Sequence, residues 1–217
     1  MTLELFGRDE STAPEREDLL PGIVLLRRRA LAIDAALVAA AQSVTAISPF
    51  RHMMTPGGFT MSVAMSNCGE WGWVTDRTGY RYDRLDPQAG KPWPAMPTVF
   101  QTLATEAAAD AGFANFIPDA CLINRYEPGA RMSLHQDRNE RDFSQPIVSV
   151  SLGLPAVFQF GGDKRADKTL RVPLAHGDVI VWGGPARLRF HGILPLKPGR
   201  QPLLGAQRLN LTFRRAG

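Results

Sequence analysis

Apolar residues recur along this chain with two different spacings, and the spacing changes near residue 118. Over 33–47 they return every three or four positions, which predicts a helix. A second helix is predicted over 97–111, because Pro97 stands at an early position where its missing N–H costs little and Gly112 follows the end. Residues 22–27, ahead of both helices, form a short apolar run typical of a strand.

After residue 118 the apolar runs become short, and turn signals separate them at 127–129, 161–162, 176–178 and 183–184. The predicted strands cover 120–126, 147–154, 157–160, 170–174, 178–182, 188–193 and 207–214. We therefore predict a mainly β protein with flanking helices, in which residues 118–217 form a jelly-roll (double-stranded β-helix) core.

The region between the two helices, residues 48–94, is rich in Gly, Met and aromatic residues. Within it, large side chains alternate with small or polar ones, so one face of a predicted strand carries Phe59, Met61, Val63 and Met65. Two interpretations stay open for this region. It is either a hairpin that seals one end of the barrel, or an adaptable lid whose aromatic side chains stack on a planar ligand.

Length and composition favour one ordinary globular domain over 1–217, with 44% hydrophobic and 21% charged residues. Residues 1–20 are acidic and lack an apolar run, so we expect a loosely held arm and neither a signal peptide nor a membrane span. The two cysteines, Cys68 and Cys121, form no C-x-x-C motif, which predicts small buried side chains in a reducing, cytoplasmic setting.

The formal net charge of +4 and the pI of about 9.4 fit a polyanionic partner without requiring one. The cationic residues cluster in two places, which are Arg138 with Arg141, and Lys164, Arg165, Lys168 and Arg171 beside a Gly-Gly turn. Charge alone leaves a phosphate-binding surface and an ordinary solvated face equally open.

A candidate metal site begins at His135 and Asp137, whose H-x-D spacing places both side chains on one face of a strand. The remaining histidines are His52, His176 and His191. His191 is favoured as the remaining ligand, because it lies inside a strand-like segment, whereas His176 sits in a tight turn. Two imidazoles and one carboxylate are the ligand set of non-haem Fe(II) oxygenases, which leave metal positions open for a cosubstrate and for O2.

The last predicted strand separates polar from apolar side chains. One face carries Arg208, Asn210, Thr212 and Arg214, and the other carries Leu209, Leu211 and Phe213. The polar face is either exposed to solvent or turned toward the metal, where guanidinium groups would bind carboxylates bidentately. Asn124 and Tyr126 share a face of another strand and would add hydrogen bonds. A dicarboxylate with a 2-oxo acid end, such as 2-oxoglutarate, matches this set.

Together with the H-x-D motif, several blocks carry a resemblance to a known family. They are residues 55–58, 67–69, 118–137, 146–162 and 176–184, and the R-x5-R motif that ends at Arg214. The chain resembles, from about residue 21 onward, the AlkB family of Fe(II)- and 2-oxoglutarate-dependent dioxygenases, which reverse alkylation damage in nucleic acid. The resemblance implies a nucleotide-recognition lid within residues 48–94.

The resemblance also implies roles for individual residues. The iron ligands would be His135, Asp137 and His191, and 2-oxoglutarate would be held by Arg208, Asn210, Arg214, Asn124 and Tyr126. Trp73 would stack on the damaged base opposite His135. The remaining substrate contacts would be Tyr80, Arg81, Tyr82, Asn139 and Arg165. The implied reaction converts 2-oxoglutarate and O2 to succinate and CO2, hydroxylates an N-alkyl carbon and releases a methyl group as formaldehyde.

One position departs from the pattern of the family. An acidic residue is expected two places after the metal-binding aspartate, where this chain has Asn139 followed by Glu140. A carboxylate favours cationic lesions such as 1-methyladenine or 3-methylcytosine, whereas an amide both donates and accepts hydrogen bonds. The base preference of this chain is therefore open.

The implied partner is alkylated DNA, single- or double-stranded, or RNA, and no membrane. A base inside a duplex must be flipped before it reaches the metal, so one enzyme molecule per lesion suffices and a monomer is expected. Two alternatives stay open. One is a 2-oxoglutarate oxygenase that acts on a protein, a lipid or a small molecule, and the other is a non-catalytic metal-binding barrel.

Overall fold

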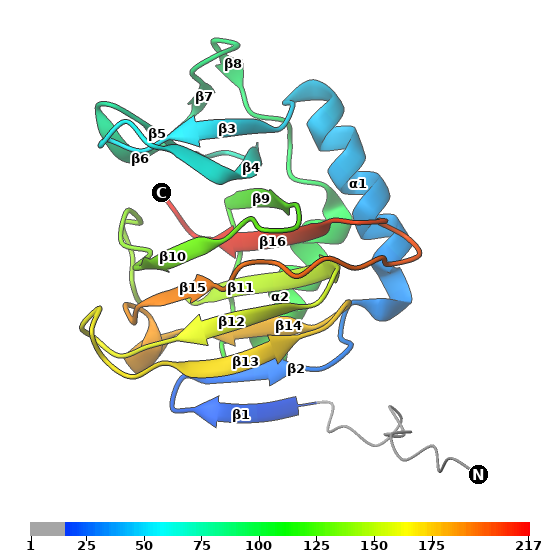
Figure 1. Ribbon diagram of the computed structural model, residues 1–217, viewed down its shortest axis with the longest axis vertical. Coiled ribbons are helices and arrows are strands. Elements are labelled where there is room, and N and C mark those ends of the chain that lie inside the picture. The colour runs from blue at the N-terminus through cyan, green and yellow to red at the C-terminus, as the bar shows by residue number, and fades with distance from the viewer. Residues whose placement is uncertain (1–15) are drawn as a thin grey trace.

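Two antiparallel β-sheets of unequal size face each other, and two helices cover the outer side of the larger sheet (Figure 1). The computed structural model describes residues 16–217. The larger sheet has eight strands in the order β1 (Arg16–Leu20), β2 (Ile23–Leu26), β14 (Val179–Trp182), β11 (Ile147–Gly153), β16 (Arg208–Arg214), β9 (Ala120–Tyr126), β4 (Thr60–Gly69) and β3 (Arg51–Met54). The smaller has four, β10 (Met132–His135), β15 (His191–Ile193), β12 (Ala156–Phe160) and β13 (Leu170–Leu174).

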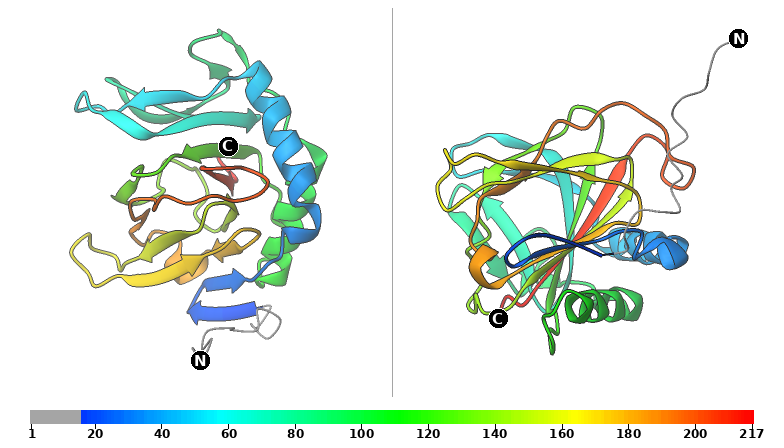
Figure 2. Two further views of the ribbon diagram at one scale, coloured as in Figure 1. Left: turned by 45° about the vertical axis from the view of Figure 1, so that its right-hand side comes forward. Right: turned by 90° about the horizontal axis from the view of Figure 1, so that it is seen from below.

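The helices α1 (Asp34–Ile47) and α2 (Thr98–Asp110) lie side by side on the larger sheet, as both views in Figure 2 show. Their buried faces, which include Leu37 and Phe100, form one apolar cluster with outward-facing strand residues such as Leu211 and Phe213. A second cluster fills the space between the sheets. The predicted helices and the predicted β core are thus confirmed, although the two sheets share no strand and do not close into a barrel.

Two predictions of local structure need correction. The arm expected over 1–20 is wrong for its last part, because β1 pairs with β2 along the edge of the larger sheet and Glu17 accepts a hydrogen bond of 2.7 Å from Arg27. Residues 1–15 lie outside the described part of the chain. The strand expected over 188–193 is confined to β15, and a short 3-10 helix, Gly184–Ala186, precedes it where two glycines and a proline interrupt the run.

The region 48–94 is divided between two structural settings. Its first strands, β3 and β4, extend the larger sheet, and β4 is buried on both faces from Val63 to Cys68 because it pairs with β9 beneath α1. Met61, Val63 and Met65 share the face that packs between the sheets, as predicted, whereas Phe59 precedes the strand and is exposed. The alternate positions are exposed only at the start of β4. Two small hairpins stand apart, β5 (Gly72–Asp76) with β6 (Gly79–Asp83), and β7 (Leu85–Asp86) with β8 (Lys91–Pro92).

Cys68 and Cys121 are buried free cysteines that face each other across β4 and β9, as expected from the sequence. Within residues 16–217, no helix is long and apolar enough to cross a membrane.

Candidate metal centre and its pocket

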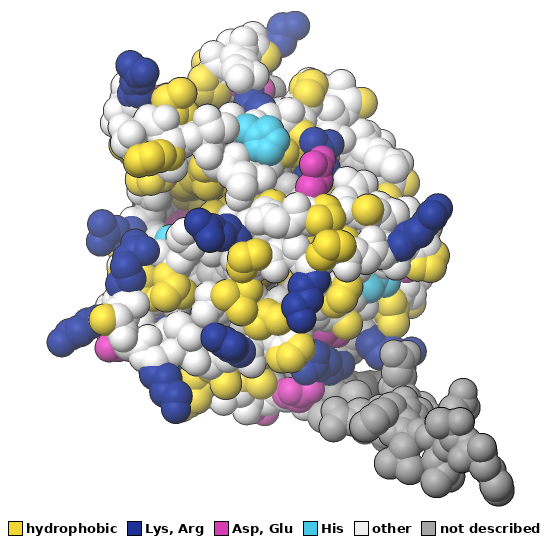
Figure 3. All heavy atoms as spheres, in the orientation of Figure 1, with side chains coloured by type: hydrophobic (Ala, Val, Ile, Leu, Met, Phe, Trp, Pro, Cys, Tyr) yellow, Lys and Arg dark blue, Asp and Glu magenta, His cyan; other side chains and the backbone are white. Residues whose placement is uncertain are grey.

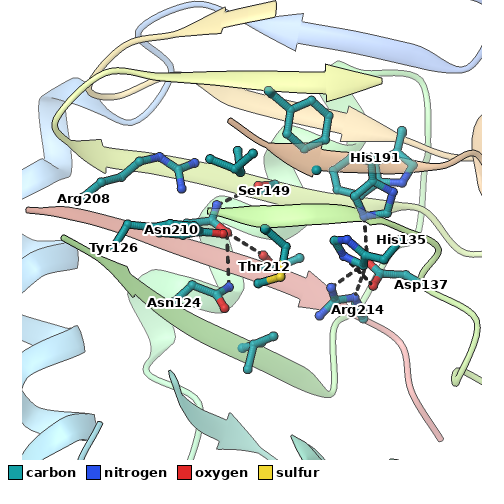
Figure 4. Close-up of a pocket in the computed structure, with 16 residues that line it drawn as sticks. Asn124, Tyr126, His135, Asp137, Ser149, His191, Arg208, Asn210, Thr212 and Arg214 are labelled. Carbon is teal, nitrogen blue, oxygen red and sulfur yellow. Dashed lines mark hydrogen bonds and ion pairs between the residues drawn. The ribbon is translucent and has the colours of Figure 1, made fainter. Parts of the chain in front are cut away.

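Three potential metal ligands converge between the two sheets. His135 ends β10 and lies directly opposite His191, which begins β15, while Asp137 follows two residues after His135. One ligand atom from each of the three lies within 4.8 Å of the others. Figure 4 shows the two imidazole rings and the carboxylate pointing toward one another. No other such group of three His, Cys, Asp or Glu residues occurs in the described range 16–217.

Backbone contacts fix the orientation of both imidazole rings. The Nδ1 atom of His135 is 2.8 Å from the carbonyl oxygen of Ser133, and that of His191 is 3.0 Å from the carbonyl oxygen of Arg189. A proton on each Nδ1 would satisfy these carbonyls and leave each Nε2 free to bind a metal. Burial, with the nearby His191 ring, lowers the pKa of His135 to about 4, so that its imidazole is neutral at physiological pH.

The Asp137 carboxylate is held in its charged form. Burial alone would raise its pKa, but Arg214, whose Nη2 atom donates a 2.6 Å hydrogen bond to Oδ2, lowers the pKa well below the usual range. The carboxylate also lies 3.5 Å from the Nε2 atom of His191. The neutral His135 imidazole, the His191 ring and the ionised carboxylate together offer a donor set that fits Fe(II).

His52 and His176 take no part in this group. The exposed His52 ring lies 2.8 Å from the carbonyl oxygen of Met61. The Nδ1 atom of His176 accepts a 2.8 Å hydrogen bond from the Gly153 N–H, and its Nε2 atom is 2.8 Å from Asp34. The geometry therefore agrees with the choice of His191 as the companion of His135 and Asp137.

A pocket with an empty volume of about 430 Å³ extends from the metal ligands along β16 and is partly open to solvent. Figure 4 shows the polar face of β16 along the pocket, with Arg208 at the far end and Arg214 beside the metal ligands. The pocket is lined by Leu122, Asn124, Tyr126, Met132, His135, Asp137, Ser149, Phe158, Trp182, His191, Gly192, Ile193, Arg208, Asn210, Thr212 and Arg214.

Arg208 is a buried cation without a neighbouring acid. Only 1% of the residue is exposed, its Nη2 atom donates to the Ser151 hydroxyl at 2.9 Å, and its Nε and Nη1 atoms have no hydrogen-bond partner in the protein. The guanidinium lies 5.0 Å from the Tyr126 ring centroid, and burial lowers its pKa. An uncompensated buried charge is costly, so this end of the pocket fits an anionic group such as a carboxylate.

Between the two arginines, amide and hydroxyl groups form a connected chain. Asn210 donates to the Ser149 hydroxyl at 2.8 Å and to the carbonyl oxygen of Val150 at 2.9 Å, while its own Oδ1 atom accepts from Thr212 at 2.9 Å. The buried Oδ1 atom of Asn124 has no partner. The polar face of β16 is thus turned inward, and the unused donors of Arg208 with the unused acceptor of Asn124 suit a polar ligand that reaches from Arg208 toward the metal.

An aromatic wall of three rings packs against His191. The ring centroids of Trp182, Phe158 and Phe160 lie 5.0, 5.8 and 6.0 Å from that of His191. No role was predicted from the sequence for Trp182, Phe158 or Phe160. A signal for them was present, because Phe158 and Phe160 share one face of the predicted strand over 157–160.

A buried ionic network joins the metal site to the β5–β6 hairpin. The Glu140 Oε1 atom accepts a 2.7 Å hydrogen bond from the Tyr82 hydroxyl and lies 3.4 Å from Arg214, and its Oε2 atom lies 3.1 Å from Arg187. Arg187 in turn donates to the carbonyl oxygen of Asp137 at 2.8 Å. No spacing rule in the sequence connects Glu140 with Arg187, and both residues were missed.

The hairpin places the expected substrate-binding aromatics outside the pocket lining. Trp73 and Tyr80 stack on each other with ring centroids 5.8 Å apart, and Tyr82 points to Glu140. Arg81 lies on the other face of β6 and pairs with Asp76 at 2.9 Å.

Two further expected contacts come from loops beside β10. Asn139 donates a long hydrogen bond of 3.4 Å to the carbonyl oxygen of Tyr80, which links the loop after Asp137 to the hairpin. Arg165 hydrogen-bonds to the carbonyl oxygen of Leu134, and its guanidinium lies 5.2 Å from the Phe190 ring centroid. Neither side chain lines the pocket, although both lie within a few residues of elements that do.

Comparisons with known proteins identify what this arrangement resembles. The sequence profile of the 2OG-Fe(II) oxygenase superfamily matches residues 24–214. The chain is 58% identical over 215 residues to the alpha-ketoglutarate-dependent dioxygenase AlkB of Escherichia coli strain K12, covering 99% of this chain and 98% of that protein.

Two other relatives extend the comparison. The DNA N(6)-methyladenine demethylase ALKBH1D of Arabidopsis thaliana is 40% identical over 108 residues, which cover 45% of this chain and 24% of that protein. The solved structure of OsALKBH1 matches with a TM-score of 0.78 at 30% sequence identity, covering 92% of this chain and 99% of that one.

Proposed function

The chain belongs to the AlkB family within the 2OG-Fe(II) oxygenase superfamily, and from that premise we propose that it removes alkyl groups from the bases of nucleic acid. It is an Fe(II)- and 2-oxoglutarate-dependent dioxygenase. The observation that carries the proposal is the meeting, in one pocket, of the His-Asp-His group with the buried, uncompensated Arg208.

The residues present fit both the metal and the cosubstrate. His135, Asp137 and His191 would hold Fe(II), and Arg208 and Arg214 would bind the carboxylates of 2-oxoglutarate, with Asn124, Tyr126 and Asn210 as neutral partners. When bound, the iron and 2-oxoglutarate supply an oxidation in which O2 is consumed, succinate and CO2 form and the alkyl carbon is hydroxylated. A hydroxymethyl group on a base nitrogen then leaves as formaldehyde. The N–C bond breaks, its electron pair stays on the nitrogen, and the hydroxyl proton is released.

The protein itself orients the reactants and limits water. Arg214 keeps Asp137 ionised, the carbonyls of Ser133 and Arg189 keep the imidazoles in one orientation, and the aromatic wall shields His191. A pocket arranged in advance avoids reorganisation during the reaction.

Substrate recognition is assigned to the β5–β6 hairpin and to the cationic surface beside the smaller sheet. Trp73 and Tyr80 offer aromatic faces for an unpaired base, and Tyr82, Arg81, Asn139 and Arg165 lie on or beside the hairpin and β10. Figure 3 shows Lys and Arg side chains spread over the face that bears β10, β12 and β13, with few acidic side chains between them. A surface of this charge suits a phosphate backbone.

A single-stranded DNA carrying the lesion is the favoured substrate, because an alkylated base that is already unpaired avoids the cost of flipping. RNA with the same lesion is the second substrate to examine. One enzyme molecule suffices for one flipped base, and two free cysteines suit a reducing compartment, so we further propose that the enzyme acts as a monomer in the cytoplasm.

The decisive experiment is mass spectrometry of a 15-nucleotide single-stranded DNA with one central 1-methyladenine, after incubation with the protein, Fe(II), 2-oxoglutarate and air. We expect loss of one methyl group with the wild type and with Arg200→Ala, which changes an exposed residue of the loop between β15 and β16. Asp137→Ala should leave the methyl group in place.

The other outcomes assign other functions. Succinate formation with an unchanged oligonucleotide would overturn nucleic-acid dealkylation and favour an oxygenase for a protein, lipid or small molecule. No succinate in the presence of iron would leave only a metal-binding protein.

A further inference from the structure

An aromatic residue that contacts two arginines lies at the base of the β5–β6 hairpin and is not among the residues that line the pocket. Trp71 directly precedes β5 and Arg84 directly follows β6. The Cζ atom of Arg84 lies 4.7 Å from the Trp71 ring centroid. Arg141, from the loop that follows the metal ligands, lies 5.4 Å from the same centroid. Three separate segments therefore bring two cations to one indole ring.

Neither cation has an acidic partner within residues 16–217. In the described part of the chain, the side chains of Arg84 and Arg141 form no ion pair and donate no hydrogen bond, and both residues are exposed. Arg81 of the same hairpin behaves differently, because it pairs with Asp76 at 2.9 Å. Two unneutralised guanidinium groups on one aromatic ring keep their donors free for an anion.

The nearby Asp119 does not supply the missing charge to these arginines. Its two carboxylate oxygens accept the backbone N–H groups of Ala216 and Gly217 at 2.6 and 3.1 Å, and the carboxylate also lies 3.7 Å from Arg215. It holds Gly217 close to the indole ring of Trp71.

The cluster shares a face with the aromatics of the hairpin. The register pairs Trp73 with Tyr82 and Gly72 with Asp83, so Trp71 and Arg84 follow as the next opposed pair. Side chains alternate between the faces of a strand, which puts Trp71 and Arg84 on the side that carries Trp73 and Tyr80. Two residues of strand span about 7 Å. The group of Trp71, Arg84 and Arg141 therefore lies next to the proposed base-stacking site and is not part of the pocket lining.

We propose that Trp71, Arg84 and Arg141 form a second nucleic-acid contact, which binds the backbone phosphate and stacks on the base of a nucleotide outside the flipped one. This inference rests on the proposed function. Arginine can remain stacked on an indole while its N–H groups bind phosphate oxygens. The contact would guide the flanking strand along the hairpin and would contribute nothing to the oxidation itself.

The test compares a long with a short substrate in the double variant Arg84→Ala/Arg141→Ala. On a 15-nucleotide single strand with a central 1-methyladenine, we expect KM to rise about tenfold, which is the size of one stacking or phosphate interaction. On the mononucleotide 1-methyl-dAMP, which has no flanking nucleotide, kcat/KM should match the wild type. Succinate formation without nucleic acid should not change. The matched control is Arg200→Ala.

Salt dependence gives a readout that a structural role would not change. The slope of log Kd against log salt for an unmodified (dT)15 should fall by about 0.7 for each phosphate of a single strand that the variant no longer neutralises. Trp71→Leu should weaken (dT)15 binding while leaving that slope nearly unchanged. An unaltered slope in the double variant, or an equal loss on both substrate lengths, would overturn the second contact. Failure of the wild type to demethylate either substrate would instead contradict the proposed function, and the (dT)15 slope would still report on the contact.

Discussion

The pocket floor and the β5–β6 hairpin differ in how firmly the rest of the protein holds their ligand-binding side chains. The floor is built from β16 in the middle of an eight-stranded sheet, and every residue from Arg208 to Arg214 is buried. The hairpin is a separate two-stranded sheet whose Tyr80 ring is nearly half exposed. Buried polar groups on central strands keep fixed positions, whereas isolated hairpins are marginal and easily displaced. The half that binds the invariant reactants is thus rigid, and the half that meets a variable substrate is built to adapt.

The largest effect is expected at Glu140, which connects the two halves. Replacement by Ala leaves Arg187 buried without its carboxylate and removes the acceptor of the Tyr82 hydroxyl. Breaking a buried ion pair costs about 3–5 kcal/mol of unfolding free energy, measurable by urea titration. Glu127→Ala is the control, because this exposed carboxylate is 3.9 Å from Arg125. Equal stability of the two variants would show that the halves are not coupled through Glu140.

A second test addresses the rigid half alone. Arg208→Met should weaken 2-oxoglutarate binding by about 2–5 kcal/mol, because the carboxylate loses its buried cation. The same variant should raise the unfolding free energy of the cofactor-free protein, since an uncompensated buried charge is replaced by an apolar side chain. Calorimetry with 2-oxoglutarate and urea titration without it measure the two effects. A loss of stability in the cofactor-free variant would contradict the account of Arg208 as an uncompensated charge.

A substitution in the adaptable half, the β5–β6 hairpin, should change KM for the oligonucleotide and not the binding of 2-oxoglutarate. Trp73→Ala removes one partner of the stacked pair and is expected to raise KM for the methylated oligonucleotide by the equivalent of about 1–3 kcal/mol. Succinate formation in the absence of oligonucleotide should equal that of the wild type. A parallel fall in both rates would mean that the hairpin also shapes the metal site.

The smallest effect is expected at Asn139, which lies between the halves. Asn139→Asp adds a carboxylate beside the Tyr80 backbone and should favour cationic over neutral lesions by up to about fivefold, the range of exposed charge pairs. The measurement is the ratio of rates on 3-methylcytosine and on a neutral lesion such as 3-methylthymine in the same oligonucleotide. An unchanged ratio would exclude Asn139 as a determinant of base preference.

The two halves also differ in how far their sequence predicts them. The two-residue period of β16 placed Arg208 and Arg214 on one face, and the H-x-D spacing brought His135 and Asp137 together, because both patterns are local. The sequence did not predict in the same way that part of residues 48–94 joins the larger sheet while the rest forms two separate hairpins. Pairing with β9 and cover by α1 buried both faces of β4, and such long-range contacts leave no period in the sequence.

The ionic network was hidden for the same reason. Glu140 and Arg187 lie far apart in the sequence, and no motif links them. Each would be expected at the surface by composition alone, since charged residues are rarely buried unless paired. Only the return of the chain between β14 and β15 brings the arginine under the loop that follows the metal ligands.

The stack of Trp73 on Tyr80 has a consequence for how the proposed repair enzyme would meet intact bases. In the absence of a ligand the two rings already hold each other in place, so an entering base meets an aromatic face that is arranged in advance. A correctly paired base, which must also leave its helix, would lose free energy on entry. Most encounters along a strand should therefore be brief, and the time saved on each intact nucleotide would let one molecule inspect many positions for every lesion that it repairs.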